Sequence, residues 1–199
     1  MKQLLLIFVK NAIVGKVKTR LAATLGDATA LSVYKQLLAH TMLVTRTLQV
    51  DKAVCYSHYV ETADIWDELY YAKQVQQGED LGARMENAFE SAFSAGYARV
   101  VIIGSDCMEL STEVIEAAFD RLGNNHVVLG PALDGGYYLL GTRSFCKPLF
   151  RGISWSTGKV LEESMKVCNE LGLETSLLPV LSDIDNAADL RRMGDKIKW

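Results

Sequence analysis

Continuous apolar runs alternate with helical periodicities along the 199 residues of this chain. The run from Leu4 to Val9 contains no polar position, which is typical of a strand that is covered on both faces in a parallel sheet. Similar patterns predict further strands at Lys52 to Ser57, Arg99 to Gly104, His126 to Gly130, 137–141 and Ser176 to Val180.

Between these strands, apolar side chains recur with the period of a helix. Such helices are predicted at 27–48, at Leu81 to Ala95, after the capping residue Ser111, at 157–171 and at 186–194. The β-α-β order predicts a three-layer α/β fold with a mostly parallel sheet. No internal repeat or proline-rich linker interrupts the pattern, so we expect residues 1–199 to form a single domain.

Three polar segments directly follow predicted strands. Lys10 to Arg20 follows the first strand, Ser105 and Asp106 follow the strand that ends at Gly104, and Asp134 follows the strand at 126–130. Ligands of such sheets bind beyond the carboxyl ends of the strands, near the point where strand order reverses. We therefore expect these segments to meet in one site.

The most informative of these segments is GPALDGGYYLLG, residues 130–141. Gly135 and Gly136 allow positive φ and a close approach of the backbone to a ligand. The carboxylate of Asp134 beside them is suited to bind a metal, a hydroxyl or a developing positive charge. The alternative is a plain hairpin turn, for which Asp-Gly is a common signal.

The segment VGKVKTRL, residues 14–21, places Gly15 and three cations between a strand and a helix. Backbone N–H groups at a helix start together with Lys16, Lys18 and Arg20 indicate an anion site, and a phosphoryl group is the expected ligand. The spacing is not that of a Walker A loop. The alternative is a solvated basic helix start.

Carboxylates supply the candidate metal ligands. Asp106 lies at the end of a buried strand, and Asp183, Asp185 and Asp189 follow the last predicted strand. One or two carboxylates suit Mg²⁺ or Mn²⁺ that bridges a diphosphate. Each acid also has a plainer interpretation as a turn or helix cap, and the pattern leaves open which of the three late acids faces the site.

Two further segments carry weaker signals. Arg84 lies one turn into the helix that follows GEDLG and is placed to reach a phosphate, a base or only water. Trp155, in ISWSTGKV, is interpreted as a core or lid residue. The three histidines show no metal or triad spacing, and no serine or cysteine has the context of an activated nucleophile.

Composition narrows the functional classes. The net charge of −3 argues against a nucleic-acid binder, so phosphate binding must come from a few placed groups. Four scattered cysteines indicate neither a zinc site nor a disulfide framework, and a reduced, cytoplasmic setting is expected. The apolar run before Lys10 is too short for a membrane span.

Taken together, VGKVKTRL, GEDLGARM, GSDC, GPALDGGYYLLG, WST and DIDNAADL resemble a family of bacterial glycosyltransferase-like proteins that was long carried as a domain of unknown function. Some of its members are associated with arsenosugar biosynthesis. The family is similar to the nucleotide-diphospho-sugar transferase fold, also called GT-A, which includes glycosyltransferases and nucleotidyltransferases.

The resemblance implies roles for individual residues. It assigns the nucleotide phosphate site to Gly15, Lys18, Thr19 and Arg20, the metal to Asp106 and Asp185, and the donor-sugar or acceptor pocket to Asp134, Gly135, Gly136 and Tyr137. The chain departs from the family at Ala12 and Met108, where proline is usual. Neither change removes a charge or a ligand, so the departures affect loop rigidity more than chemistry.

The sequence thus predicts a transferase that binds a nucleotide with Mg²⁺ or Mn²⁺ and moves a sugar from a nucleotide sugar to a small acceptor, with Asp134 as its catalytic residue. A nucleotidyltransferase that consumes a nucleoside triphosphate and releases pyrophosphate is the second hypothesis. A non-catalytic nucleotide-binding domain is the third. The base, the sugar, the acceptor and the oligomeric state are not determined by the sequence.

Overall fold

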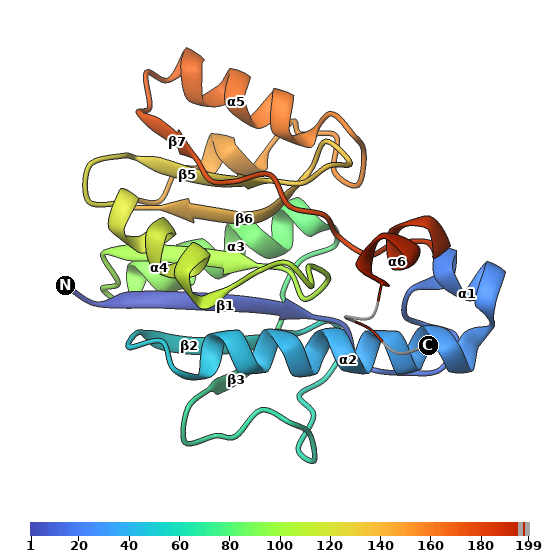
Figure 1. The fold of residues 1–199 in the computed structure, drawn as a ribbon. Helices are drawn as coiled ribbons and strands as arrows, with labels where there is room; N and C mark the ends of the chain where they lie inside the picture. Colours follow the sequence, from blue (N-terminus) through green and yellow to red (C-terminus); the bar gives the residue numbers. More distant parts are fainter. Residues whose placement is uncertain (195–196, 198–199) are drawn as a thin grey trace.

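The computed structural model of the chain describes residues 1–194 and 197. Seven strands form one sheet in the order β3-β2-β1-β4-β6-β5-β7 (Figure 1). Their bounds are β1 Gln3–Val9, β2 Asp51–Tyr56, β3 Ala72–Val75, β4 Arg99–Ile103, β5 Val127–Pro131, β6 Tyr137–Thr142 and β7 Thr175–Leu177. Every pairing is parallel except those of β6, which runs antiparallel to both β4 and β5.

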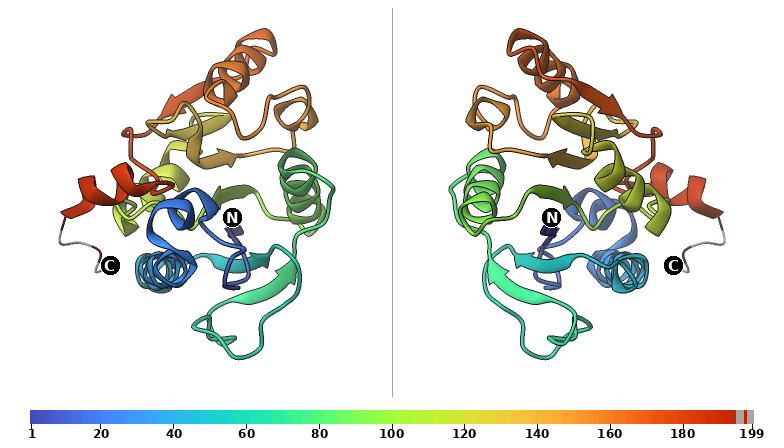
Figure 2. Two further views of the ribbon diagram at one scale, coloured as in Figure 1. Left: turned by 90° about the vertical axis from the view of Figure 1, so that its right-hand side faces the viewer. Right: turned by 90° about the vertical axis from the view of Figure 1, so that its left-hand side faces the viewer.

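Helices cover both faces of the sheet, as the end-on views of Figure 2 show. They are α1 Thr19–Leu25, α2 Asp27–Arg46, α3 Leu81–Ser94, α4 Thr112–Arg121, α5 Val160–Glu170, α6 Ala187–Met193 and the 3₁₀ turn η1 Lys147–Phe150. Alternate side chains of β1 belong to different cores: Leu5 and Ile7 pack with α2 and α4, whereas Leu4 and Leu6 pack with α3 and η1. The predicted three-layer α/β fold with a mostly parallel sheet is confirmed.

Several boundaries differ from the sequence prediction. The helix expected from residue 157 begins at Val160, and residues 157–159 form a bend and a turn before it. The last strand is limited to Thr175–Leu177. The short elements α1, β3 and η1 were not expected, since each has seven residues or fewer and too little periodicity to reveal it.

The sheet topology brings the polar segments together. The chain passes from β1 to β2 on one side and returns to β4 on the other, so loops that leave the carboxyl ends of β1 and β4 diverge from a common gap. Because β6 is antiparallel, the turn between β5 and β6 also lies at this edge, and the Gly104 N–H donates to the Tyr138 carbonyl 3.3 Å away. Within the described part of the chain, no helix combines the length and apolarity needed to cross a membrane.

Candidate active site

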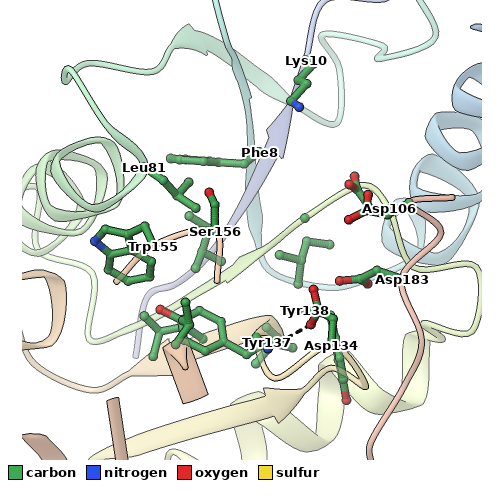
Figure 3. A pocket seen from close by; sticks show the side chains of 18 of the residues that line it. Phe8, Lys10, Leu81, Asp106, Asp134, Tyr137, Tyr138, Trp155, Ser156 and Asp183 are labelled. Atoms are coloured by element: carbon green, nitrogen blue, oxygen red, sulfur yellow. Dashed lines mark hydrogen bonds between the residues drawn. The ribbon is translucent and has the colours of Figure 1, made fainter. Parts of the chain in front are cut away.

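A cavity of about 510 Å³ opens at this edge of the sheet. Figure 3 shows that its two ends differ in character, with acids gathered at one end and apolar side chains at the other. The charged lining residues are Lys10, Lys18, Arg20, Asp106, Asp134, Asp183 and Asp185. The apolar end is lined by Phe8, Leu81, Met85, Tyr137, Trp155 and Val160. The cavity therefore offers one end for charged groups and one for a carbon-rich group.

The centre of the charged end is the ammonium group of Lys18. Its Nζ lies 2.7 Å from Oδ2 of Asp106 and 3.0 Å from Oδ1 of Asp185, and only 5% of its side chain is exposed. Lys18 adopts a left-handed backbone conformation, with φ 48° and ψ 47°, immediately before α1. Arg20 lies two residues further along the chain, 3.8 Å from the second oxygen of Asp185. One buried cation thus holds together acids from two distant segments.

This contact changes the protonation equilibria of its partners. Burial by itself would lower the pKa of Lys18, but the charges of Asp106 and Asp185 outweigh burial and raise that pKa. Burial would likewise raise the pKa of Asp106, and the adjacent ammonium lowers it below its usual value. The lysine is therefore charged and the carboxylate ionised near neutral pH.

The three late acids have different environments. Asp189 forms a capping box with Asn186: its Oδ2 accepts from the backbone N–H groups of Asp185 and Asn186, and Oδ1 accepts from Arg192. Asp185 contacts Lys18 as described. Asp183 lines the cavity, and burial, followed by the charge of Asp106, raises its pKa to about 7. Asp183 and Asp185 therefore face the cavity, whereas Asp189 caps α6.

The turn that carries Asp134 is closed by its own side chain, because Oδ1 accepts a hydrogen bond of 2.9 Å from the N–H of Gly136. Gly135 has a φ of 88°, and a Cβ at this position would lie 2.2 Å from the carbonyl oxygen of Gly158. The close approach that requires glycine here is therefore made to another segment of the chain. Gly136 and Tyr137 line the cavity, whereas Gly135 does not.

Two of the predicted phosphate-binding residues, Arg84 and Gly15, also do not line the cavity in this structure. Arg84 turns back to its own loop, where Nε donates to the carbonyl of Gly78 over 3.0 Å and a terminal nitrogen reaches Gln76 at 3.4 Å. Gly15 is exposed and has a φ of 73°, so its role here is to form the turn before α1. Thr19 and Arg20 do line the cavity, as the sequence predicts.

The sequence interpretation missed several lining residues. Lys10 begins a segment that the carboxyl-end rule placed at the site, but the sequence interpretation assigned it no role of its own. Ser156 and Thr157 line the cavity beside Trp155, which the sequence left as core or lid. Tyr34 of α2 also reaches the charged end, where its hydroxyl donates to the carbonyl of Lys10. No local signal marks it, since its helical pattern is that of a core residue.

Comparison with known proteins decides the family. Residues 41–157 match the model of a family described as "Uncharacterized protein conserved in bacteria (DUF2064)". The chain belongs to this family. The matched region covers more than half of the chain and includes Asp106 and Asp134, whereas Lys18 and Asp185 lie outside it. Among curated proteins, none matches the chain.

Solved structures extend the family relationship to a fold. A protein from Desulfovibrio desulfuricans G20 that is named for the nucleotide-diphospho-sugar transferases is 34% identical, with a TM-score of 0.87, and the match covers 98% of this chain and 89% of that chain. The resemblance that the sequence indicated is thereby confirmed. The predicted enzyme class, a transferase of the nucleotide-sugar transferase or nucleotidyltransferase kind, is confirmed at this level.

More distant structures share the fold alone. Rv0371c from Mycobacterium tuberculosis H37Rv is 17% identical with a TM-score of 0.64, over 96% of this chain and 97% of that chain. A manganese complex of Rv0371c matches at 13% identity and a TM-score of 0.55, over 97% and 98% of the two chains. The inositol-1-phosphate CTP transferase from T. maritima is 14% identical with a TM-score of 0.53, over 94% and 91%.

Proposed function

We propose that residues 1–199 form one metal-dependent glycosyltransferase domain, which moves a sugar from a nucleotide sugar to a small acceptor. The observation that carries the proposal is the buried Lys18 ammonium between Asp106 and Asp185, in the cavity that Asp134 also lines. This arrangement combines a phosphate-binding cation, candidate metal ligands and a candidate base. A cavity of about 510 Å³ is also within the usual range for a ligand site.

The residues present fit a hard divalent cation. Oxygens of Asp106 and Asp185 both lie within 3.0 Å of the Lys18 nitrogen, so the two carboxylates converge on one cation, which in this structure is the ammonium group. Among residues 1–194 and 197, no group of three or more potential ligands is arranged to hold a metal alone. Mg²⁺ commonly takes one or two carboxylates and completes its shell with phosphate oxygens and water. Asp106 and Asp185 are the proposed ligands of Mg²⁺ or Mn²⁺.

When bound, the cation would supply Lewis-acid stabilisation of the leaving diphosphate. The protein's own cations would stabilise the same negative charge. Lys18 is fixed in a buried position, whereas Arg20 is 74% exposed and held to Asp185 only by a contact of 3.8 Å. Positioned charges in a partly desolvated cavity stabilise developing charge more strongly than charges in water. The proposed role of Asp134 is to accept the proton of the acceptor hydroxyl or to hold the donor sugar.

A second candidate is nucleotidyl transfer, in which a phosphorylated small molecule attacks the α-phosphate of a nucleoside triphosphate. The specific observation in its favour is Lys10, a third cation in the lining besides Lys18 and Arg20, because a triphosphate carries more charge than a nucleotide sugar. The same positioning and charge stabilisation would serve this reaction. The two reactions differ in what they release.

The test combines binding and product analysis. Thermal unfolding is measured against nucleoside triphosphates and nucleotide sugars, with and without Mn²⁺, and a ligand at about 100 times its Kd stabilises by roughly 2.7 kcal/mol. We expect metal-dependent stabilisation by one nucleotide sugar and release of its nucleoside diphosphate when acceptors are added. Preference for a triphosphate with release of pyrophosphate would favour the second candidate. If the protein binds a nucleotide but turns over no donor, and if Asp106→Asn leaves the affinity unchanged, the chain is a non-catalytic nucleotide-binding domain.

A further inference from the structure

The apolar end of the cavity depends on a missing side chain in α3. A Cβ at Gly82 would lie 2.2 Å from Nε1 and 2.9 Å from Cε2 of Trp155. The indole therefore occupies the space that any other residue at position 82 would need. It meets the ring of Tyr137 edge-on, with ring centroids 6.3 Å apart and an interplanar angle of 87°. Trp155 thus forms a fixed wall of the cavity.

The loop that carries Trp155 is tied to two helices just before the tryptophan. Arg151 donates to the two carboxylate oxygens of Glu86 in α3, over 2.9 and 3.1 Å. Ser154 is held to α5, because its N–H and its hydroxyl both donate to Glu163, over 2.6 and 3.0 Å. Because the loop is tied to two helices, the position of the indole is set before a ligand enters.

The segment that follows the wall is tied to the turn of the candidate base, although Asp134 itself lies at the acidic end of the cavity (Figure 3). The turn of Asp134 contacts the segment after Trp155, since the N–H of Leu161 donates to the carbonyl of Gly135 over 3.0 Å. Figure 3 shows Trp155, Leu81 and Phe8 facing the cavity from the side opposite Asp106 and Asp183. A group that reacts near Asp134 therefore has an apolar wall on one side and the proposed diphosphate site on the other.

The Lys10 side of the cavity differs from the Trp155 side (Figure 3). Lys10 lines the cavity there, whereas its neighbour Asn11 is buried and bonded within the protein, to the carbonyl of Tyr59 over 3.0 Å and to the N–H of His58 over 3.1 Å. A C–H-rich ring face suits an aromatic wall. With the sugar on Trp155, the nucleoside is left with the Lys10 side.

We infer that Trp155 is a specificity-determining residue that binds the carbon face of the transferred sugar, and that Gly82 is a positioning residue that sets the orientation of the indole. The inference rests on the proposed glycosyl transfer and names which part of the donor each end of the cavity takes. The nucleoside lies on the Lys10 side, and the sugar lies between Trp155 and Asp134.

The experiment compares two affinities in each variant. Calorimetric titration uses UDP, GDP, CDP, ADP and dTDP and their hexose conjugates as probes, with Mn²⁺ present. For the conjugate that the wild type binds, Trp155→Ala is expected to weaken affinity about tenfold, or about 1.4 kcal/mol, and to leave affinity for the matching diphosphate within about twofold. Trp155→Phe keeps a ring and should retain most of the affinity for the conjugate.

Two further variants separate positioning from general loosening. Gly82→Ala collides with the indole and also with the backbone carbonyl of Phe150, which lies 2.8 Å from a Cβ at this position, so it displaces the indole and shifts the loop. It should weaken the affinity for the conjugate and spare the affinity for the diphosphate, with KM raised more than kcat is lowered. Phe145→Ala is the matched control, because Phe145 stacks on Phe150 below the same loop, with centroids 6.3 Å apart, and does not line the cavity. This control should leave both affinities unchanged, and thermal unfolding of each variant reports whether it folds.

Three results would overturn the inference. If Trp155→Ala folds and binds the conjugate as the wild type does, the sugar does not lie on the indole, although the proposed function stands. If Trp155→Ala loses affinity equally for the conjugate and for the diphosphate, the indole contacts the nucleoside and not the sugar. If the wild type binds no nucleotide sugar, the proposed function fails, and this inference fails with it.

Discussion

The Nζ of Lys18 lies 2.7 Å from Oδ2 of Asp106, and the same nitrogen also contacts Asp185. Replacement by methionine keeps the volume of the side chain and leaves the two carboxylates facing each other without a counter-charge. Because the carboxylates are more than a third exposed, we expect Lys18→Met to cost about 2 kcal/mol of unfolding free energy, less than a fully buried pair would. Urea unfolding measures this loss.

Lys16→Met is the matched control for that substitution, since Lys16 lies in the same loop and is exposed. It should change stability by less than about 0.5 kcal/mol. Equal losses in the two variants would mean that the contact with the carboxylates contributes nothing to stability.

The second prediction concerns the charge of Asp134. Asparagine can still accept the hydrogen bond from the Gly136 N–H that closes the turn, so Asp134→Asn should fold normally. If the carboxylate is the general base, kcat should fall by about 10² or more. Steady-state kinetics on the donor identified by the binding panel measure the effect. Unaltered turnover would remove the catalytic role.

The third prediction tests why the turn contains glycine at position 135. Gly26 has a similar φ, 84° against 88°, but nothing lies within 4 Å of a Cβ there. Alanine at either position carries the strain of positive φ, whereas only Gly135→Ala also collides with the carbonyl of Gly158. Gly135→Ala should therefore destabilise by about 2 kcal/mol more than Gly26→Ala in thermal or urea unfolding. Equal costs would show that the collision is relieved by a shift of the loop.

The fourth prediction is a pH dependence. Hydrogen bonds from Arg151, assisted by Lys147, lower the pKa of Glu86 in the folded protein. A lowered folded-state pKa contributes stability above the unfolded pKa, and that stability is lost as pH falls through the folded value. Glu86→Gln should therefore be less stable than the wild type by about 1 kcal/mol at pH 7, and the difference should vanish by about pH 3.

Unfolding curves across this pH range measure the difference. Glu116→Gln, an exposed position on α4, should differ little from the wild type at any pH. If the difference in unfolding free energy between the wild type and Glu86→Gln stays constant down to acidic pH, the side chain acts through packing and not through its charge.

Most of the sheet could be predicted from the sequence because the central strands are short apolar runs, whereas the edge strand β3 has the mixed sequence AKQV and was not predicted. The position of the site followed as well, since the carboxyl-end rule selected Lys18, Asp106 and Asp134, all of which line the cavity. What no local pattern encodes is the contact between Lys18 and Asp185, which are 167 positions apart. The sequence therefore predicted a cation for phosphate but not its burial between two acids.

The remaining differences have similar causes. Arg84 has a guanidinium group that could bind a phosphate. In the structure this group donates to the carbonyl of Gly78 and is held in its own loop. Asp189 looked equivalent to its neighbours until the helix start showed that its oxygens satisfy backbone N–H groups. Trp155 lines the cavity in space that is left by the glycine at position 82 of α3. A single sequence gives no sign that these two residues are in contact.

The reversed direction of β6 has one more consequence. The segment between Pro131 and Tyr137 is a hairpin connection whose two ends are paired to each other, so it does not have to cross the sheet. The same connection is also bonded to two other segments, because the N–H of Leu133 donates to the carbonyl of Leu181 and the N–H of Leu161 donates to the carbonyl of Gly135. An insertion into the hairpin would therefore leave the strand register intact but disturb the start of α5 and the segment that leads to α6.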